Sequence, residues 1–231
     1  MPEKTLEICQ ALYDYSLPPE GIDHPYLFNA EKKGLTNYRL LDMSIVSHLG
    51  LKYWPDYVIK FISAHDQVIA CFNFFCEKVV SVIMRSIEGK DFRIYGLRPI
   101  IPYGLGGISL RFGQPLLIVE GIYDRDVVVD VVPNTIALLT SGFSSFVLDI
   151  IPTLTNNLVL CLDSDKAGQQ GVKKIRWLYE KRGSVLDLKL PSGIKDLGDI
   201  GNLLYRKKTV KYQLAMDTIV RNFEALGVLK R

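Results

Sequence analysis

The sequence has few residues of the kinds that build sulfur or imidazole metal centres. It contains four cysteines and three histidines in 231 residues. The cysteines show no Cys-x-x-Cys spacing and have no histidine nearby; they are Cys9, Cys71, Cys76 and Cys161. A zinc ribbon and a dithiol redox pair are therefore excluded, so no zinc is expected and buried, reduced thiols are predicted.

Long apolar runs, internal repeats and low-complexity tracts are absent as well. The longest uncharged run, Val131 to Leu148, is interrupted by Pro133, Asn134 and Gly142, which excludes a transmembrane helix. No charged segment followed by an apolar one opens the chain, and no Walker A motif is present. These absences favour a cytoplasmic protein without a membrane partner and without a fused P-loop motor.

The composition permits a well-packed domain and a nucleic-acid partner without selecting either. An apolar fraction of 48% in 231 residues is enough for a sizeable core. A formal net charge of +3 suits binding to nucleic acid, but many enzymes that bind none have a similar balance. Composition therefore does not indicate the function, and only the motifs can.

The first half of the chain predicts helices followed by an antiparallel sheet. Residues 36–50 carry leucine, isoleucine and valine at helical spacing, which predicts a helix. Residues 57–95 are rich in β-branched and aromatic residues separated by short polar turns. This pattern predicts an antiparallel meander.

From Pro115 onward, short apolar strands alternate with amphipathic segments. Strands are predicted at 116–119, 135–139, 158–162 and 185–190, and helices at 126–132, 144–154, 168–182 and 209–226. Strand–helix alternation is typical of a mostly parallel sheet flanked by helices. The predicted fold class is therefore α/β, with an α+β part before it.

Acidic residues follow the two most apolar strands of this second half. Glu120 and Gly121 come directly after the strand 116–119, and Asp163-Ser164-Asp165 follows the strand 158–162. The carboxyl ends of parallel strands line the crevice where ligands bind. Three carboxylates facing one volume repel one another unless a divalent cation neutralises them, and oxygen ligands suit Mg²⁺ or Mn²⁺.

Each acidic residue taken alone is more often a helix cap or a solvated loop residue. The joint pattern is more specific: an apolar strand and Glu-Gly, an α/β segment, then a second apolar strand and Asp-x-Asp-x-x-Gly. Gly168, which closes that pattern, allows a turn into the next helix. The amides at that helix N-terminus and the adjacent Lys166 favour phosphate binding.

These motifs resemble those of the Toprim domain over about residues 115–202. Leu117 to Asp124 is similar to the primase form of the first Toprim motif, and Leu160 to Gly168 to the second. The resemblance implies that Glu120, Asp163 and Asp165 are the catalytic residues. The segment Leu190 to Asp196 is similar to the acidic loop of primases, with Leu197-Gly198 in place of a proline. Two Mg²⁺ or Mn²⁺ ions are then implied, with Asp196 and Asp199 as further ligands.

A fainter resemblance to the catalytic core of bacterial and phage DnaG-type primases continues upstream. It is carried by His24 to Leu27, by Gly34-Leu35, by Leu49 to Leu51 and by Tyr103-Gly104-Leu105. The predicted organisation is a primase-like N-terminal subdomain at 1–114, a Toprim domain at 115–202 and a C-terminal helix at 203–231. Topoisomerases lack this upstream segment.

Basic residues mixed with aromatics in the meander are predicted to contact a template. They are Arg85, Lys90, Arg93 and Arg98, and Arg85 falls where the family places an arginine. A solvated sheet face is an equally good reading of any one of them. Ser141 and Gly142, after the second Toprim strand, are predicted to approach a phosphate, and a simple strand-to-helix loop is the alternative.

The resemblance implies a primase that makes short RNA from ribonucleoside triphosphates on single-stranded DNA, in a bacterial or phage-infected cell. The zinc-binding and helicase-binding modules usual in the family are not found, which implies that a replicative helicase or a separate start-site protein supplies those roles. A small Toprim nuclease that uses the same acids remains an alternative. A non-catalytic replication or recombination mediator that binds DNA is another.

Overall fold

The computed structural model describes residues 2–18, 38–42, 54–65, 67–87, 91–110, 114–130, 132–139, 145–190 and 194–199, and also 217–218, 220–222 and 224–225. These residues group into two compact units, one reaching Ile101 and the other starting at Pro102. The boundary predicted at residue 114 stays a prediction.

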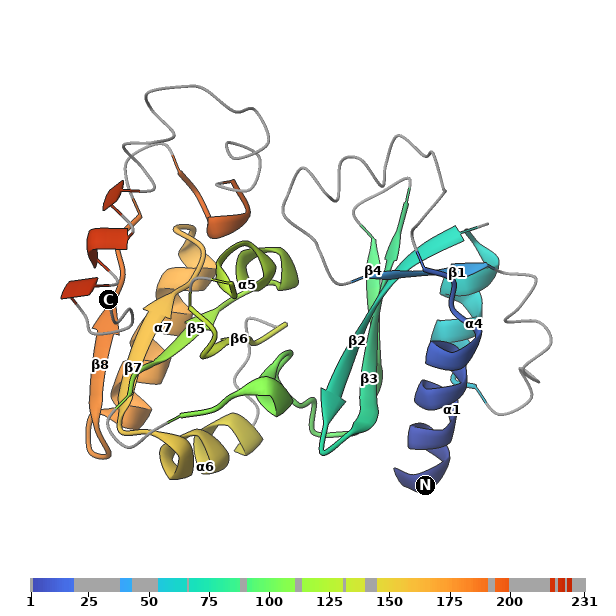
Figure 1. The fold of residues 1–231 in the computed structure, drawn as a ribbon, viewed down its shortest axis with the longest axis horizontal. Helices are drawn as coiled ribbons and strands as arrows, with labels where there is room; N and C mark the ends of the chain where they lie inside the picture. The colour runs from blue at the N-terminus through green and yellow to red at the C-terminus, as the bar shows by residue number, and fades with distance from the viewer. Residues whose placement is uncertain are drawn as a thin grey trace. The chain divides into compact units, whose positions relative to one another are not determined.

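The first unit is a four-stranded antiparallel sheet with two helices. The strands are β1 (Arg39–Asp42), β2 (Gln67–Phe75), β3 (Lys78–Ser86) and β4 (Phe92–Gly96), and they pair in chain order. The helices are α1 (Pro2–Tyr15) and α4 (Asp56–Ser63). Figure 1 shows both helices beside this sheet.

The core of this unit lies between the helices and one face of the sheet. Side chains alternate between faces along a strand, so Val82 and Met84 of β3 point to the helices with Phe72 of β2. Leu12 of α1 and Ile62 of α4 are fully buried against them. Burial of a large aliphatic side chain contributes about 1.5–3 kcal/mol, so this layer holds the helices on the sheet.

The meander prediction is confirmed from β2 to β4. The β2–β3 hairpin turns at Cys76 and Glu77, with φ of 49° and 63°. Positive φ at both turn residues gives the twist that joins two antiparallel strands. Residues 57–63 were wrongly included in the meander, because Val58, Phe61 and Ile62 recur at helical spacing and form the buried side of α4.

The helix predicted over 36–50 is wrong for residues 39–42. Leu40 pairs with Ile69 of β2, and on its other edge it exchanges two 2.8 Å backbone hydrogen bonds with Leu17. Backbone pairing on both edges overrides a weak helical pattern. Residues 43–50 lie outside the described residues, as do His24 to Leu27, Gly34-Leu35 and Leu49 to Leu51.

The second unit is a four-stranded parallel sheet with helices on its faces. The strands are β5 (Leu116–Val119), β6 (Thr135–Ala137), β7 (Asn157–Cys161) and β8 (Ser184–Asp187), in the spatial order β6-β5-β7-β8. The helices are α5 (Ile122–Val128), α6 (Ser145–Leu154) and α7 (Lys166–Tyr179). The predicted α/β class, with one antiparallel and one mostly parallel sheet, is confirmed.

The connections reverse direction between β5 and β7. From β5 the chain passes through α5 to β6 on one side, and from β7 it passes through α7 to β8 on the other. Right-handed crossovers therefore place α5 on one face and both α6 and α7, which contact each other, on the opposite face. A reversal of this kind opens a crevice at the carboxyl ends of the two strands.

A short turn precedes this sheet. Tyr103 pairs with Ala137 of β6, and Leu105–Gly107 form a single 3₁₀ turn. Gly104 has a φ of 86°, and a Cβ there would come within 2.0 Å of Arg125 Nε. The positive φ therefore favours glycine in the Tyr-Gly-Leu string, and a larger residue would also displace the Arg125 side chain.

Most elements of the second half lie within a few residues of their predicted bounds. Helix α5 begins at Ile122, four residues before its predicted start at residue 126, because its first turn is closed by Asp124. The described residues of the predicted helix 209–226 are helical, and the others lie outside the described part. None of the described helices is long and apolar enough to span a membrane.

Candidate active site

The candidate site lies at the carboxyl ends of β5 and β7, where the sheet connections reverse. Val119, the last residue of β5, pairs with Cys161, the last residue of β7. Glu120 follows the first strand at once, and Asp163 lies two residues beyond the second. The sheet therefore holds the first and second acidic motifs next to each other.

Glu120 is half-buried beside the two aspartates of the second motif. Its pKa is raised by burial first and by the charges of Asp163 and Asp165 next, while a hydrogen bond from the Asp163 backbone and the Lys195 charge lower it. Like charges raise a carboxyl pKa only when they lie close by. The structure thus brings together the three acids predicted as catalytic.

The backbone of Glu120 also bonds to the segment that follows β6. The Leu139 N–H donates to the Glu120 carbonyl at 3.0 Å, and Leu139 has a φ of 66°. A bulky residue in this left-handed region costs about 1–3 kcal/mol. The strain is stored directly beside the acidic cluster, a feature that composition did not reveal.

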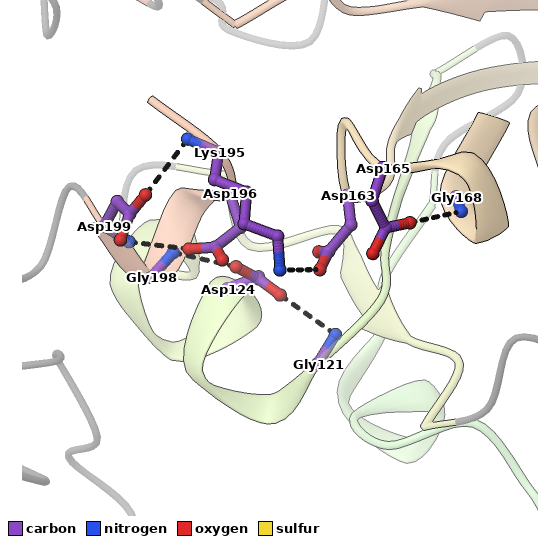
Figure 2. A network of polar contacts seen from close by, with 9 residues as sticks. All are labelled: Gly121, Asp124, Asp163, Asp165, Gly168, Lys195, Asp196, Gly198 and Asp199. Carbon is purple, nitrogen blue, oxygen red and sulfur yellow. Dashed lines mark hydrogen bonds and ion pairs between the residues drawn. The ribbon is translucent and has the colours of Figure 1, made fainter. Parts of the chain in front are cut away.

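Asp165 and Gly168 form the N-terminus of α7. The Asp165 Oδ1 atom accepts a 3.0 Å hydrogen bond from the Gly168 N–H, as an N-cap residue does (Figure 2). A Cβ on Gly168 would lie 2.0 Å from the Asp163 carbonyl oxygen. The glycine of Asp-x-Asp-x-x-Gly is therefore required by a close backbone approach, and its N–H already has an acceptor.

Lys195 joins the acidic loop to the second motif. Its Nζ lies 3.1 Å from Asp163 Oδ2, and its carbonyl accepts from the Ser164 N–H at 3.3 Å. The hydrogen bond and charge of Asp163 raise the pKa of Lys195. The Lys195 ammonium thus lies against the Asp163 carboxylate, as Figure 2 shows.

Asp196 and Asp199 are engaged in their own loop. Asp196 Oδ1 accepts from the Asp199 N–H at 2.8 Å, and Asp199 Oδ2 accepts from the Lys195 N–H at 3.0 Å. Burial raises the pKa of Asp196, and Asp163 adds to the rise. Figure 2 shows Asp199 on the far side of Asp196 from Asp163, so Asp196 is the loop carboxylate nearer the cluster.

Asp124 is a residue of the site to which the sequence analysis gave no role. Its side chain is 7% exposed and accepts two backbone hydrogen bonds, from Gly121 N–H at 3.0 Å and from Gly198 N–H at 2.8 Å. It therefore ties the first motif to the acidic loop. Burial raises the pKa of Asp124 to about 7, against the lowering effect of those two donors.

Comparison with known proteins identifies the architecture. Residues 117–200 match a family model described as Toprim-like. The structure is similar to a DnaG primase catalytic domain bound to ssDNA, with 15% identity and a TM-score of 0.62, over 96% of this chain and 83% of that one. It is also similar to a DNA primase domain from Pseudomonas aeruginosa, with 14% identity and a TM-score of 0.62, over 92% and 78% of the two chains.

The E. coli primase catalytic core is a third similar structure, with 15% identity and a TM-score of 0.59, over 94% of this chain and 83% of that one. The chain has the fold of a DnaG-type primase catalytic core. No curated protein matches the sequence. The Toprim-like match covers the segment that contains Glu120, Asp163 and Asp165.

The basic residues predicted to bind a template do not share one face of the primase-like sheet. Arg93 pairs with Met84, which faces α1 and α4, and its guanidinium lies 5.5 Å from the ring centre of Phe61. Arg85 pairs with Phe92 and points to the opposite face. Arg98 is exposed beyond β4, and Lys90, Ser141 and Gly142 lie outside the described residues.

The Toprim acids fit a hard divalent cation by their chemistry. Glu120, Asp163 and Asp165 offer only oxygen ligands, and after burial the charges of the two aspartates raise the pKa of Glu120. Within the described part of the chain, no three acidic, histidine or cysteine side chains form a ready-made metal cage. In this structure, Asp163 pairs with the Lys195 ammonium and Asp165 accepts a hydrogen bond from the Gly168 N–H.

Lys195→Met is expected to tighten Mn²⁺ binding about fivefold. A unit charge about 4 Å from a cation costs about 1 kcal/mol in water, and about 1 kcal/mol is a fivefold change in affinity. Stability should fall by no more than about 1 kcal/mol, since Lys195 is 55% exposed. Calorimetric Mn²⁺ titration measures the affinity. Lys189→Met, which removes an ion pair to Asp187, is the matched control, and equal affinities for both variants would contradict the expectation.

Proposed function

We propose that this chain is a metal-dependent primase-type nucleotidyltransferase that makes short RNA on single-stranded DNA. One observation carries the proposal: the three acids meet at the switch point of a Toprim-like sheet, in a chain with the primase-core fold over more than nine-tenths of its length. One of the similar structures is described as bound to ssDNA.

In this proposal, Glu120, Asp163 and Asp165 hold the cations, with Asp196 as a further ligand and Asp199 as a more distant one. Bound Mg²⁺ or Mn²⁺ would neutralise the triphosphate and activate the attacking hydroxyl. Glu120 either binds metal or accepts the hydroxyl proton. Lys195 and Lys166 supply positive charge for phosphate, and Asp124 holds the acidic loop in place through Gly198.

The acids alone do not separate polymerase from nuclease chemistry, so the test must do so. The full chain is incubated with single-stranded template, labelled ribonucleoside triphosphates and Mg²⁺ or Mn²⁺. Labelled oligoribonucleotides support the proposal. Shortened template would assign a nuclease, and template binding without either product would assign a mediator. The same proposal includes a replicative helicase or a separate start-site protein as a partner. It also places the reaction in the cytoplasm of a bacterial or phage-infected cell.

Arg85→Ala is expected to weaken template binding more than Arg93→Ala. In this proposal the template follows the sheet face that carries Arg85, whereas Arg93 lies on the helix-covered face over Phe61. Losing one phosphate contact to a single strand lowers the salt slope of binding by about 0.7. Fluorescence anisotropy at several salt concentrations measures both quantities. Equal losses of affinity in the two variants would place the template at the edge strand β4 instead, which borders both faces of the sheet.

A further inference from the structure

Helix α7 has an outer face that the candidate site does not use. Its buried face is formed by Gly168, Gly171, Ile175 and Tyr179, and Tyr179 donates a hydrogen bond to the Thr155 carbonyl. At 100° per residue, the opposite face centres on Lys173 and Trp177. The residues of this outer face are exposed; they are Lys166, Gln169, Gln170, Lys173, Lys174, Arg176, Trp177, Glu180 and Lys181.

Trp177 stands out on this face because it is 76% exposed, more than any other large hydrophobic side chain among the described residues. Tryptophan is usually well buried, and an exposed indole is enriched at binding surfaces. The helix does not need it for packing, since Ile175 and Tyr179 fill the contact with the sheet. Packing within the helix and sheet therefore does not account for the exposed ring.

The charge around Trp177 is almost entirely positive. Residues 166–182 contain six lysines and arginines and one acidic residue, Glu180. Among the described residues, Lys173, Lys174 and Arg176 form no ion pair with a carboxylate. These cations surround the indole on the same helix face, so they are available to an anionic partner that also presents a flat group.

The position of this face connects it to the acidic cluster. Helix α7 begins directly after its cap residue Asp165. Its 14 residues span about 21 Å at a rise of about 1.5 Å per residue. A chain lying along the outer face would therefore extend from the acidic cluster to Trp177 and beyond.

We infer that the outer face of α7 binds single-stranded nucleic acid, with Trp177 stacking on a base and the surrounding lysines and arginines contacting phosphates. Stacking on an aromatic side chain beside a positively charged track is the way proteins hold single strands without reading sequence. An acidic peptide would satisfy the charges but has no flat group in every residue to cover the indole. The inference concerns binding, which needs neither a metal ion nor a nucleoside triphosphate, and so it does not depend on the proposed reaction.

The two tryptophans make the test direct. Trp54 is 6% exposed and Trp177 is 76% exposed, so a base that stacks on protein should quench Trp177 fluorescence. The full chain is titrated with oligo(dT) without metal or nucleotides, and affinity is measured independently by anisotropy of a labelled oligonucleotide. We expect quenching in the wild type and at least an approximately fivefold loss of affinity in Trp177→Ala.

A charge reversal distinguishes binding at the outer face of α7 from general electrostatic attraction to the protein. Lys173→Glu should weaken oligo(dT) binding and lower the salt slope, whereas Lys60→Glu, which makes the same charge change at an exposed position of α4, should alter both far less. Thermal unfolding of Trp177→Ala should match the wild type, because the indole is mostly exposed. Affinities of Trp177→Ala and Lys173→Glu within twofold of wild type would overturn the inference. Quenching by poly-glutamate but not by oligo(dT) would also overturn it and assign the face to an acidic protein.

Discussion

Glu120→Gln is expected to abolish template-directed nucleotide incorporation while the protein stays folded. The side chain is half-buried next to Asp163 and Asp165, and the substitution keeps its shape while removing its charge. Whether Glu120 binds metal or accepts a proton, its role requires the carboxylate. Template binding should change little, because the basic surfaces proposed for the template lie elsewhere.

The raised pKa of Glu120 gives this variant a second readout. A carboxyl group whose pKa is raised by folding stabilises the protein below its unfolded pKa, and this contribution is lost as the pH rises through the folded pKa. At neutral pH the ionised Glu120 therefore lowers the stability of the wild type, and glutamine does not. The melting temperature of metal-free Glu120→Gln should equal or exceed that of the wild type.

Incorporation of labelled ribonucleotides and a metal titration separate the two possible roles of Glu120. A shift of the Mn²⁺ dependence to higher concentration identifies a ligand, and an unchanged dependence identifies a base. Glu7→Gln, at an exposed position of α1, is the control. Turnover of Glu120→Gln within about twofold of wild type, a barrier change of only a few tenths of a kcal/mol, would remove Glu120 from the site and refute the proposed mechanism.

The second half of the chain was predictable because its signals are local and agree with one another. The fully buried strand 116–119 was placed without error, and the acids after two such strands were expected to meet. The first half held conflicting signals. Leu40 and Leu41 fit a helix and a strand equally well, and only the pairing with β2 and Leu17 decides between them.

The contacts that organise the site were not predictable for a different reason. Asp124 reaches Gly198 across 74 positions of sequence, and no local pattern specifies such a partner. Its contact with Gly121 was predictable, since an acid three residues after Gly121 at a helix start is a capping signal. Lys195 likewise adjoins the predicted acidic loop, but only the fold brings its amine to Asp163.

Asp124→Ala is expected to destabilise the protein by about 2–3 kcal/mol at pH 7. The carboxylate accepts hydrogen bonds from Gly121 and Gly198, and each buried donor left without an acceptor costs about 1–3 kcal/mol. Part of this loss is offset, because the variant no longer buries a carboxylate. Hydrogen exchange of the Gly198 amide should become faster, since the acidic loop loses its link to α5.

The pH dependence of this variant follows from the pKa of about 7 for Asp124. Because that pKa is above the value of the unfolded chain, the wild type gains stability from this group as the pH falls from about 7 towards about 4. Alanine lacks this gain, so the stability difference between the two proteins should widen between pH 7 and pH 5. Urea unfolding at several pH values measures it, with Asp130→Ala, exposed just beyond α5, as the control. A stability difference below about 0.5 kcal/mol, the usual range for surface substitutions, would show that the link between α5 and the acidic loop does not stabilise the site.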